Sequence, residues 1–148
     1  MASHVIRSEP RRAGVTKLLE SAALPTADLT DAHMKHFFFA GTADSPTGVV
    51  GLELCGSDAL LRSLVVAKTD RSTGLGAALT EHAEQQARAA GARSIFLLTT
   101  TAESFFAHRG YVAAPRESAP TAIAHTREFA DICPASSAFM VKHLRRDP

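Results

Sequence analysis

The stretch from Leu64 to Gly76 constrains the fold of this chain more than any other. A nearly continuous apolar run over residues 59–67 ends in a polar turn, and two glycines, Gly74 and Gly76, then open a helical pattern. Such a run is typical of a strand covered on both faces. Glycines at a helix start allow a ligand to approach unpaired backbone N–H groups at the positive end of the helix dipole. The stretch therefore predicts a strand–turn–helix unit that suits a diphosphate, with the guanidinium of Arg71 beside it.

Strand and helix patterns alternate along the rest of the chain. The expected strands lie at residues 4–9, 37–40, 49–54, 59–67, 95–98, 111–112 and 138–144. The expected helices lie at residues 11–24, 74–90, 102–109 and 120–130. The first strands follow one another as a meander, and later strands alternate with helices. This order predicts an α/β fold with a mixed sheet.

Composition excludes several classes of protein. The 148 residues suit one domain, and 45% hydrophobic with 21% charged residues is near the globular average. A net charge of +1 is too balanced for a general nucleic-acid binder. We expect no membrane span, because no apolar run approaches 20 residues, and no secretory signal at the N-terminus. With two cysteines, Cys55 and Cys133, expected as buried thiols, a cytoplasmic protein is the default.

Two blocks of sequence resemble the GNAT N-acetyltransferase superfamily. The spacing Arg-x-x-Gly-x-Gly after a Leu-x-Val strand resembles its acetyl-CoA pyrophosphate loop. The segment Thr99–Tyr111, in which a short aromatic helix ends in Gly-aromatic, looks like the next block of the family. The resemblance covers about residues 4–144. It implies a GNAT-like α/β fold over residues 1–148, with a mixed, mostly antiparallel central sheet, flanking helices and splayed central strands.

The same resemblance implies acetyl-CoA as cosubstrate, lying between strands at residues 59–67 and 94–100. Backbone groups near Leu64 to Val66 would hold the pantetheine arm and polarise the thioester carbonyl. The residues expected at the cofactor are Leu64, Val65, Val66, Arg71, Ser72, Thr73, Gly74, Leu75, Gly76, Phe106 and Arg109.

A narrower resemblance links the chain to small acetyltransferases associated with bacterial arsenic resistance. It rests on four segments, residues 62–66, 98–102, 105–106 and 133–140, and the Thr-Thr-x-Ala-x-x-Phe-Phe pattern is also similar to N-acetylglutamate synthases. Both comparisons imply direct acetyl transfer to the amine of a small acidic amino acid or an analogue, including arsenic- or phosphorus-containing ones that are detoxified. Arg62 and Thr99 are the expected acceptor-binding residues, and Glu53 and Arg62 are the expected catalytic residues.

The chain departs from the family pattern at two positions that bear on catalysis, and also at Lys68, a turn position where proline is frequent. Phe106 stands where many relatives have a tyrosine that protonates the leaving thiolate, and Tyr111 is expected to pack in the next strand. Arg62 stands where many relatives have a glutamate base. Its partner is either Glu53, in a fixed ion pair, or a substrate anion, and Glu53 could also act as base through a water. These departures keep open a second hypothesis, a non-enzymatic acyl-CoA-binding sensor or regulatory module.

The remaining expectations concern metals and partners. His33 and His36 are three residues apart without a third ligand, so no metal site is expected. The expected partner is a small-molecule amine, with no nucleic acid and no membrane, and a homodimer is the assembly considered.

Overall fold

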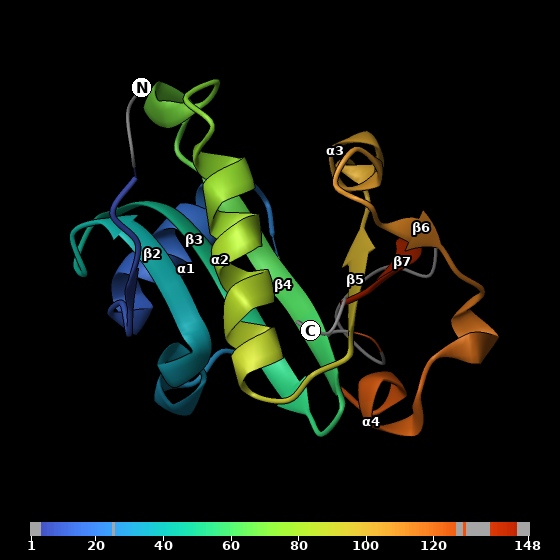
Figure 1. The fold of residues 1–148 in the computed structure, drawn as a ribbon. Coiled ribbons are helices and arrows are strands. Elements are labelled where there is room, and N and C mark those ends of the chain that lie inside the picture. The colour runs from blue at the N-terminus through green and yellow to red at the C-terminus, as the bar shows by residue number, and fades with distance from the viewer. Residues whose placement is uncertain (1–3, 25, 127–128, 130–136, 145–148) are drawn as a thin grey trace.

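The computed structural model describes residues 4–24, 26–126, 129 and 137–144. Within these residues one sheet runs in the order β1-β2-β3-β4-β5-β7-β6 (Figure 1). Its strands are β1 (Arg7–Ser8), β2 (Phe37–Gly41), β3 (Pro46–Cys55), β4 (Asp58–Val66), β5 (Ser94–Thr99), β6 (Val112–Ala113) and β7 (Ala138–His143). The helices are α1 (Arg12–Ser21), α2 (Leu75–Ala89), α3 (Glu103–Ala107) and α4 (Thr121–Ala124), with 3-10 helices η1 (Asp31–His36), η2 (Lys68–Asp70) and η3 (Arg116–Ser118).

The strands β4 and β5 are the parallel pair in an otherwise antiparallel sheet. Their pairing joins Asp58–Leu60 to Ser94–Phe96, although β4 continues to Val66 and β5 to Thr99. Figure 1 shows the two strands diverging toward the ends that lead into η2 and α3. The expected mixed, mostly antiparallel sheet with splayed central strands is thereby confirmed.

A β-bulge in β4 coincides with this divergence. Val49 of β3 faces Val65, whereas Gly51 faces Arg62, so two residues of β4 oppose one residue of β3. The extra residue Ser63 has φ of +60°, a conformation that non-glycine residues rarely adopt. Strain of this kind persists where the surrounding structure holds it, and it often marks a functional site.

The two faces of the sheet are covered by different helices. On the α2 face, the stripe Leu75, Leu79, Ala83 and Ala87 of α2 is at most 2% exposed and packs on the sheet. The small alanines let this helix lie close to the strands. On the opposite face, here called the α1 face, Val15 and Leu19 of α1 pack on β2 and β3, while α4 covers β5 and β7.

Several elements are shorter than the sequence predicts. The first strand pairs over two residues instead of 4–9, and the strand expected at Tyr111 begins one residue later. The helix expected over 120–130 covers Thr121–Ala124, and residues 127, 128 and 130 lie outside the described part. Short elements are hard to delimit because tertiary packing decides their ends. No helix among the described residues is long and apolar enough to cross a membrane.

Candidate functional site

A cleft of about 1020 Å³ opens where β4 and β5 diverge. One wall is residues 61–66 of β4, and the other is residues 97–102 at the end of β5 and beyond. The rest of the lining comes from residues 22–24 and 27 after α1, Arg71, Gly76 of α2, Phe105 and Phe106 of α3, and Ser137. The site therefore exists because the parallel ladder stops at Leu60 while both strands continue.

The N-terminus of α2 opens beside this cleft. Gly74 precedes the helix in the left-handed conformation, with φ of +84°, and no side chain caps the first turn. The turn before it is closed by the Thr73 hydroxyl, which donates to the Asp70 carbonyl at 2.6 Å. A second hollow of about 230 Å³, here called the α2 hollow, adjoins this helix end. Uncapped backbone N–H groups and the helix dipole make this end suitable for an anion.

Two guanidinium groups flank the α2 hollow. Arg71 donates from Nε to the Val66 carbonyl at 3.2 Å, and its side chain lines both the cleft and the hollow. The guanidinium carbon of Arg109 lies 4.2 Å from the centre of the Phe105 ring. Gly76 lines the same hollow, and a Cβ added there would meet Phe105 at 3.5 Å, an ordinary contact. A positive, glycine-floored hollow of this kind fits the diphosphate of a nucleotide cofactor.

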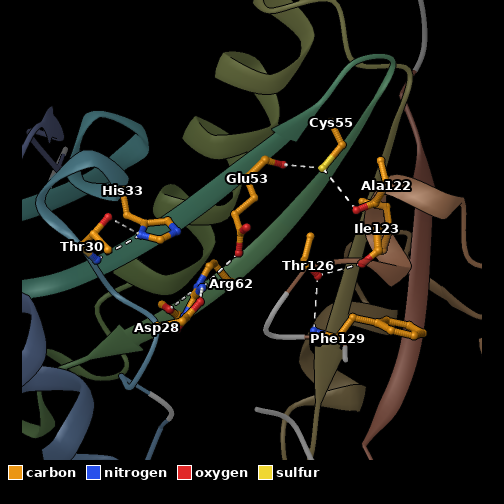
Figure 2. A network of polar contacts seen from close by, with 11 residues as sticks. Asp28, Thr30, His33, Glu53, Cys55, Arg62, Ala122, Ile123, Thr126 and Phe129 are labelled. Atoms are coloured by element: carbon orange, nitrogen blue, oxygen red, sulfur yellow. Dashed lines mark hydrogen bonds and ion pairs between the residues drawn. The ribbon is translucent and has the colours of Figure 1, made fainter. Parts of the chain in front are cut away.

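Arg62 of β4 lies at the centre of a buried ion-pair network (Figure 2). Its side chain is fully buried, and Nη1 donates to Glu53 at 3.0 Å. Asp28, from the loop after α1, accepts from both terminal nitrogens, with Nη2 to Oδ1 at 2.9 Å. Nε donates to Ser63 at 3.0 Å, which ties the bulge to the network. The expected Arg62–Glu53 ion pair is present, and Asp28 is a partner that the sequence did not indicate.

The network carries more negative than positive charge. Burial alone would raise the pKa of Asp28, but the hydrogen bonds and charge of Arg62 outweigh it and lower that pKa below its usual value. The Asp28 side chain is 3% exposed and that of Glu53 is 20% exposed. Of the two carboxylates, Glu53 is therefore the one more accessible to water, although Arg62 lines the cleft and neither carboxylate does.

His33 adds a third polar group to the two carboxylates. One of its ring nitrogens, a carboxylate oxygen of Asp28 and one of Glu53 lie within 4.8 Å of one another. Its Nδ1 accepts the Thr30 backbone N–H at 3.0 Å. Arg62 already donates hydrogen bonds to both carboxylates, so the oxygens that a metal ion would need are engaged. The cluster fits an ion-pair network better than a metal centre.

Phe106, on α3, and Tyr111, four residues after α3 ends, have different surroundings. Phe106 is 4% exposed and lines the cleft, and its ring packs edge-on against that of Tyr111. Tyr111 is 1% exposed and donates to Glu84 at 3.0 Å, and Lys142 holds the other oxygen of Glu84. Burial, together with the charge of Glu84, raises the pKa of Tyr111. Tyr111 is therefore a core residue and is not placed to protonate a ligand in the cleft.

Most residues expected at the cofactor surround one or both hollows. Those lining the cleft are Leu64, Val65, Val66, Arg71, Gly76 and Phe106, together with Thr99. Those lining the α2 hollow are Arg71, Ser72, Gly74, Leu75, Gly76 and Arg109. Thr73 lines neither hollow and serves the turn instead. Thr99 also accepts the backbone N–H of Ala102 at 3.0 Å, which fixes the chain ahead of α3.

The structure describes one of the two cysteines, Cys55. Cys55 is half-buried, its Sγ within 4.0 Å of the Ala122 carbonyl, and burial with the nearby carboxylates of Glu53 and Asp58 raises the pKa of its thiol (Figure 2). Its role as a structural thiol stays a prediction. Cys133 lies outside the described residues.

Among known proteins, one curated relative and many solved structures are similar to this chain. The "Amino-acid acetyltransferase" of Ralstonia nicotianae is 42% identical over 57 residues, which is 38% of this chain and 13% of that protein. An N-acetylglutamate synthase from Neisseria gonorrhoeae, complexed with coenzyme A and N-acetyl-glutamate, matches 99% of this chain with a TM-score of 0.80. The identity there is 20%, and the chain spans 36% of the synthase.

A structure from Mycobacterium tuberculosis in complex with CoA matches 95% of this chain and 99% of its own length. Its TM-score is 0.77 at 19% identity, so the likeness is one of fold. The model of the acetyltransferase (GNAT) domain family matches residues 6–127, which is most of the sequence. The diverging strands β4 and β5 and the glycines at the start of α2 agree with this match, which shows that the chain belongs to the acetyltransferase (GNAT) family.

Proposed function

We propose that this chain is an acetyl-CoA-dependent N-acetyltransferase that transfers an acetyl group directly to the amine of a small amino acid. The observation that carries the proposal is the cleft between the diverging strands β4 and β5, which meets the uncapped N-terminus of α2. Membership of the acetyltransferase family supports the reaction class. The similarity to an amino-acid acetyltransferase and to a synthase complexed with coenzyme A supports the substrate class.

The diphosphate of acetyl-CoA would bind at the first turn of α2. Gly74 and Gly76 admit it to the backbone, and Arg71 and Arg109 supply positive charge from two sides. Each charge-assisted hydrogen bond contributes about 1.5–3 kcal/mol. Beyond Leu60 the ladder between β4 and β5 ends, so backbone groups from Leu64 to Val66 would serve the pantetheine arm and the thioester.

The acceptor would approach from the α1 face of the sheet. Along β4, Leu61 packs in the cluster under α2, whereas Leu60 packs with α4. Because neighbouring side chains of a strand alternate, Arg62 lies on the α1 face with Glu53. The cofactor would therefore enter from the α2 face and present its thioester through the gap. Holding two reactants in line in this way lowers the barrier by about 7–11 kcal/mol.

Glu53 is the proposed proton acceptor for the amine, directly or through a water. Arg62 and Asp28 are positioning residues, because they hold the Glu53 carboxylate without touching the reacting atoms. Phe106 cannot donate a proton, and Tyr111 is bonded to Glu84 in the core. Coenzyme A would thus leave as a thiolate or take its proton from water, which a thiol of pKa about 8.5 permits.

The finer substrate hypothesis is a small acidic amino acid, or its arsenic- or phosphorus-containing analogue. Its support is the sequence resemblance alone, part of which lies in residues 133–136, outside the described residues. Arg62 is less suited to bind a substrate anion than the sequence suggested, because it already holds two carboxylates. A single acetyltransferase domain over residues 1–148, a cytoplasmic location, a homodimer and the absence of nucleic-acid or membrane partners are likewise proposals.

The proposed function is tested by thiol release from acetyl-CoA across a panel of amino acids, with products identified by mass spectrometry. We expect an N-acetyl amino acid in stoichiometric amount with the released thiol. Tight binding of acetyl-CoA with no release on any amine would overturn the proposal in favour of an acyl-CoA sensor.

The role of Glu53 is tested by Glu53→Gln, which keeps an oxygen for Arg62 but removes the basic carboxylate. We expect kcat to fall by a factor of about 10²–10⁴, with the KM for acetyl-CoA and the Tm nearly unchanged. The exposed Glu81→Gln on α2 is the matched control. An unchanged kcat would show that Glu53 is not the base.

A further inference from the structure

Thr99, the last residue of β5, carries a hydroxyl proton that none of the described residues accepts. Its Oγ accepts the backbone N–H of Ala102 at 3.0 Å, and no other hydrogen bond joins this side chain to the described residues. A threonine hydroxyl can accept and donate at the same time, so its proton is left for another partner. The residue is half-buried and lines the cleft between β4 and β5. It is therefore a hydrogen-bond donor held in place at the wall of the cleft.

The strand register places Thr99 on the cofactor side of the gap. Along β5, Leu97 packs in the cluster under α2, whereas Leu98 packs on the opposite face. Thr99 pairs with Ala138 of β7, which also packs in the cluster under α2. Because directly opposite residues of an antiparallel pair share a face, Thr99 lies on the α2 face. This is the side from which the cofactor would enter, so Thr99 is less suited to bind the acceptor than the sequence suggested.

The aromatic side chains on this side offer no proton to a leaving sulfur. Phe106 lines the cleft and packs in the cluster under α2, but its side chain is a hydrocarbon. Tyr111 is 1% exposed, and its hydroxyl donates to Glu84 in the core. Among the described residues that line the cleft, Thr99 is the hydroxyl-bearing residue that strand pairing places on the α2 face. It is therefore the donor best placed to meet the sulfur of a bound acetyl-CoA.

We propose that the Thr99 hydroxyl donates a hydrogen bond to the sulfur of acetyl-CoA and stabilises the thiolate that leaves. The proposal rests on the proposed acetyltransferase function and deepens it by naming the residue that serves the leaving group. The amine nitrogen bonds to the thioester carbonyl carbon, the C–S bond breaks, and its electron pair stays on the sulfur. The proton of the amine goes to Glu53, as proposed above, and the threonine keeps its own proton. Coenzyme A leaves as a thiolate that water later protonates.

The proposal makes a prediction about coenzyme A bound without an acceptor. A hydrogen bond to the charged form of a group lowers the pKa of that group. The pKa of the bound coenzyme A thiol should therefore lie below that of free coenzyme A. It is measured by a pH titration of the complex, followed by the ultraviolet absorbance of the thiolate. The protein without coenzyme A is the blank for its own thiols and its tyrosine.

The test compares Thr99→Val, which removes the hydroxyl at nearly constant volume, with Thr99→Ser, which keeps it. We expect the pKa of the bound thiol to rise by about one to two pH units in Thr99→Val, as for a hydrogen bond to a charged group. In Thr99→Ser that pKa should stay near the wild-type value. With the preferred amino acid, kcat should fall about ten- to a hundredfold in Thr99→Val, with the KM for the amino acid nearly unchanged.

Thr42→Val is the matched control for the structural role of the side chain. The exposed Thr42 accepts the backbone N–H of Ser45 through its Oγ at 3.0 Å, which is the same local contact that Thr99 makes with Ala102. Thr42 lines neither the cleft nor the α2 hollow. Its replacement should leave both kcat and the pKa of the bound thiol unchanged.

The failures of the two proposals are distinguishable. Equal thiol pKa values in the wild-type and Thr99→Val complexes overturn the role of Thr99 and leave acetyl transfer intact. Thr99→Ala gives the same comparison should valine prevent folding. A wild-type complex whose thiol pKa is not below that of free coenzyme A also overturns the role. If no amine releases thiol, the proposed function fails, and the titration, which needs no amine, still decides for or against Thr99. A protein that does not bind coenzyme A refutes both proposals.

Discussion

At the scale of single residues, the acceptor side of the cleft depends on how Arg62 is held. A guanidinium that is fully buried is stable because both oxygens of Asp28, one of Glu53 and the hydroxyl of Ser63 accept from it. The pairing also ties three segments together: the loop after α1, strand β3 and the bulge of β4. The network therefore shapes the site and stabilises the fold at once.

Arg62→Leu should destabilise the protein strongly, because it leaves the buried carboxylate of Asp28 and the partly buried one of Glu53 without a cation. Removing one member of a buried ion pair costs about 3–5 kcal/mol, which should appear as a large fall in Tm. The exposed Arg93→Leu should leave Tm nearly unchanged. Equal melting temperatures in the two variants would show that the network adds no stability.

Sequence reasoning found part of this network. Glu53 was expected as a partner of Arg62 because an arginine in an apolar strand needs an anion nearby. Asp28 was not, since it lies 34 positions away in a loop without a periodic pattern.

At the scale of elements, α2 carries both the cofactor end of the cleft and a large part of the core. Its apolar period and the two glycines were sufficient to predict the helix and its position after β4. The bulge was not predictable, because Ser63 adopts a left-handed conformation at a position where the sequence offers no glycine. The end of the ladder at Leu60 likewise follows from sheet geometry, and the residues alone did not locate it.

Gly76→Ala should affect the stability of the fold and the binding of acetyl-CoA differently. The added Cβ meets Phe105 and Val66 at ordinary contact distances, and alanine favours a helix over glycine by about 1 kcal/mol. The Tm should therefore hold or rise, while the dissociation constant for acetyl-CoA rises because the methyl group obstructs the diphosphate. A thermal shift assay with and without acetyl-CoA measures both. Unchanged ligand stabilisation would place the diphosphate elsewhere.

His82 of α2 should make the fold sensitive to acid. Its ring packs against Phe38, with centroids 4.9 Å apart, and burial lowers its pKa below the ordinary 6.5. The unfolded chain therefore binds a proton more readily, so stability is complete above pH 6.5 and declines as pH falls below it. Asp28 acts in the same direction below its ordinary pKa of 3.8.

Urea unfolding at pH 7.5 and pH 5.5 measures this effect. We expect a lower midpoint at pH 5.5 for the wild type, and a smaller difference for His82→Gln, which has no proton to gain. Equal pH dependence in both proteins would exclude His82 as the cause.

At the scale of the whole molecule, the sheet separates an α2 face from an α1 face, and the cleft lies where β4 and β5 diverge. The α2 face offers positive charge and backbone N–H groups, and the α1 face offers a network with excess negative charge. Under the proposed function, a cofactor diphosphate and a cationic amine would thus be attracted to opposite sides of the same gap. The divergence of β4 and β5 is what allows the two reactants to meet.

The most direct test of this account is a calorimetric titration of acetyl-CoA into the wild type, Arg71→Ala and Arg93→Ala. Arg71 lines both hollows beside the start of α2, whereas Arg93 is exposed just beyond the other end of that helix. The account predicts one site per chain, an affinity about ten- to a hundredfold weaker in Arg71→Ala, and no change in Arg93→Ala. Equal affinities in all three proteins, or no binding to the wild type, would contradict it.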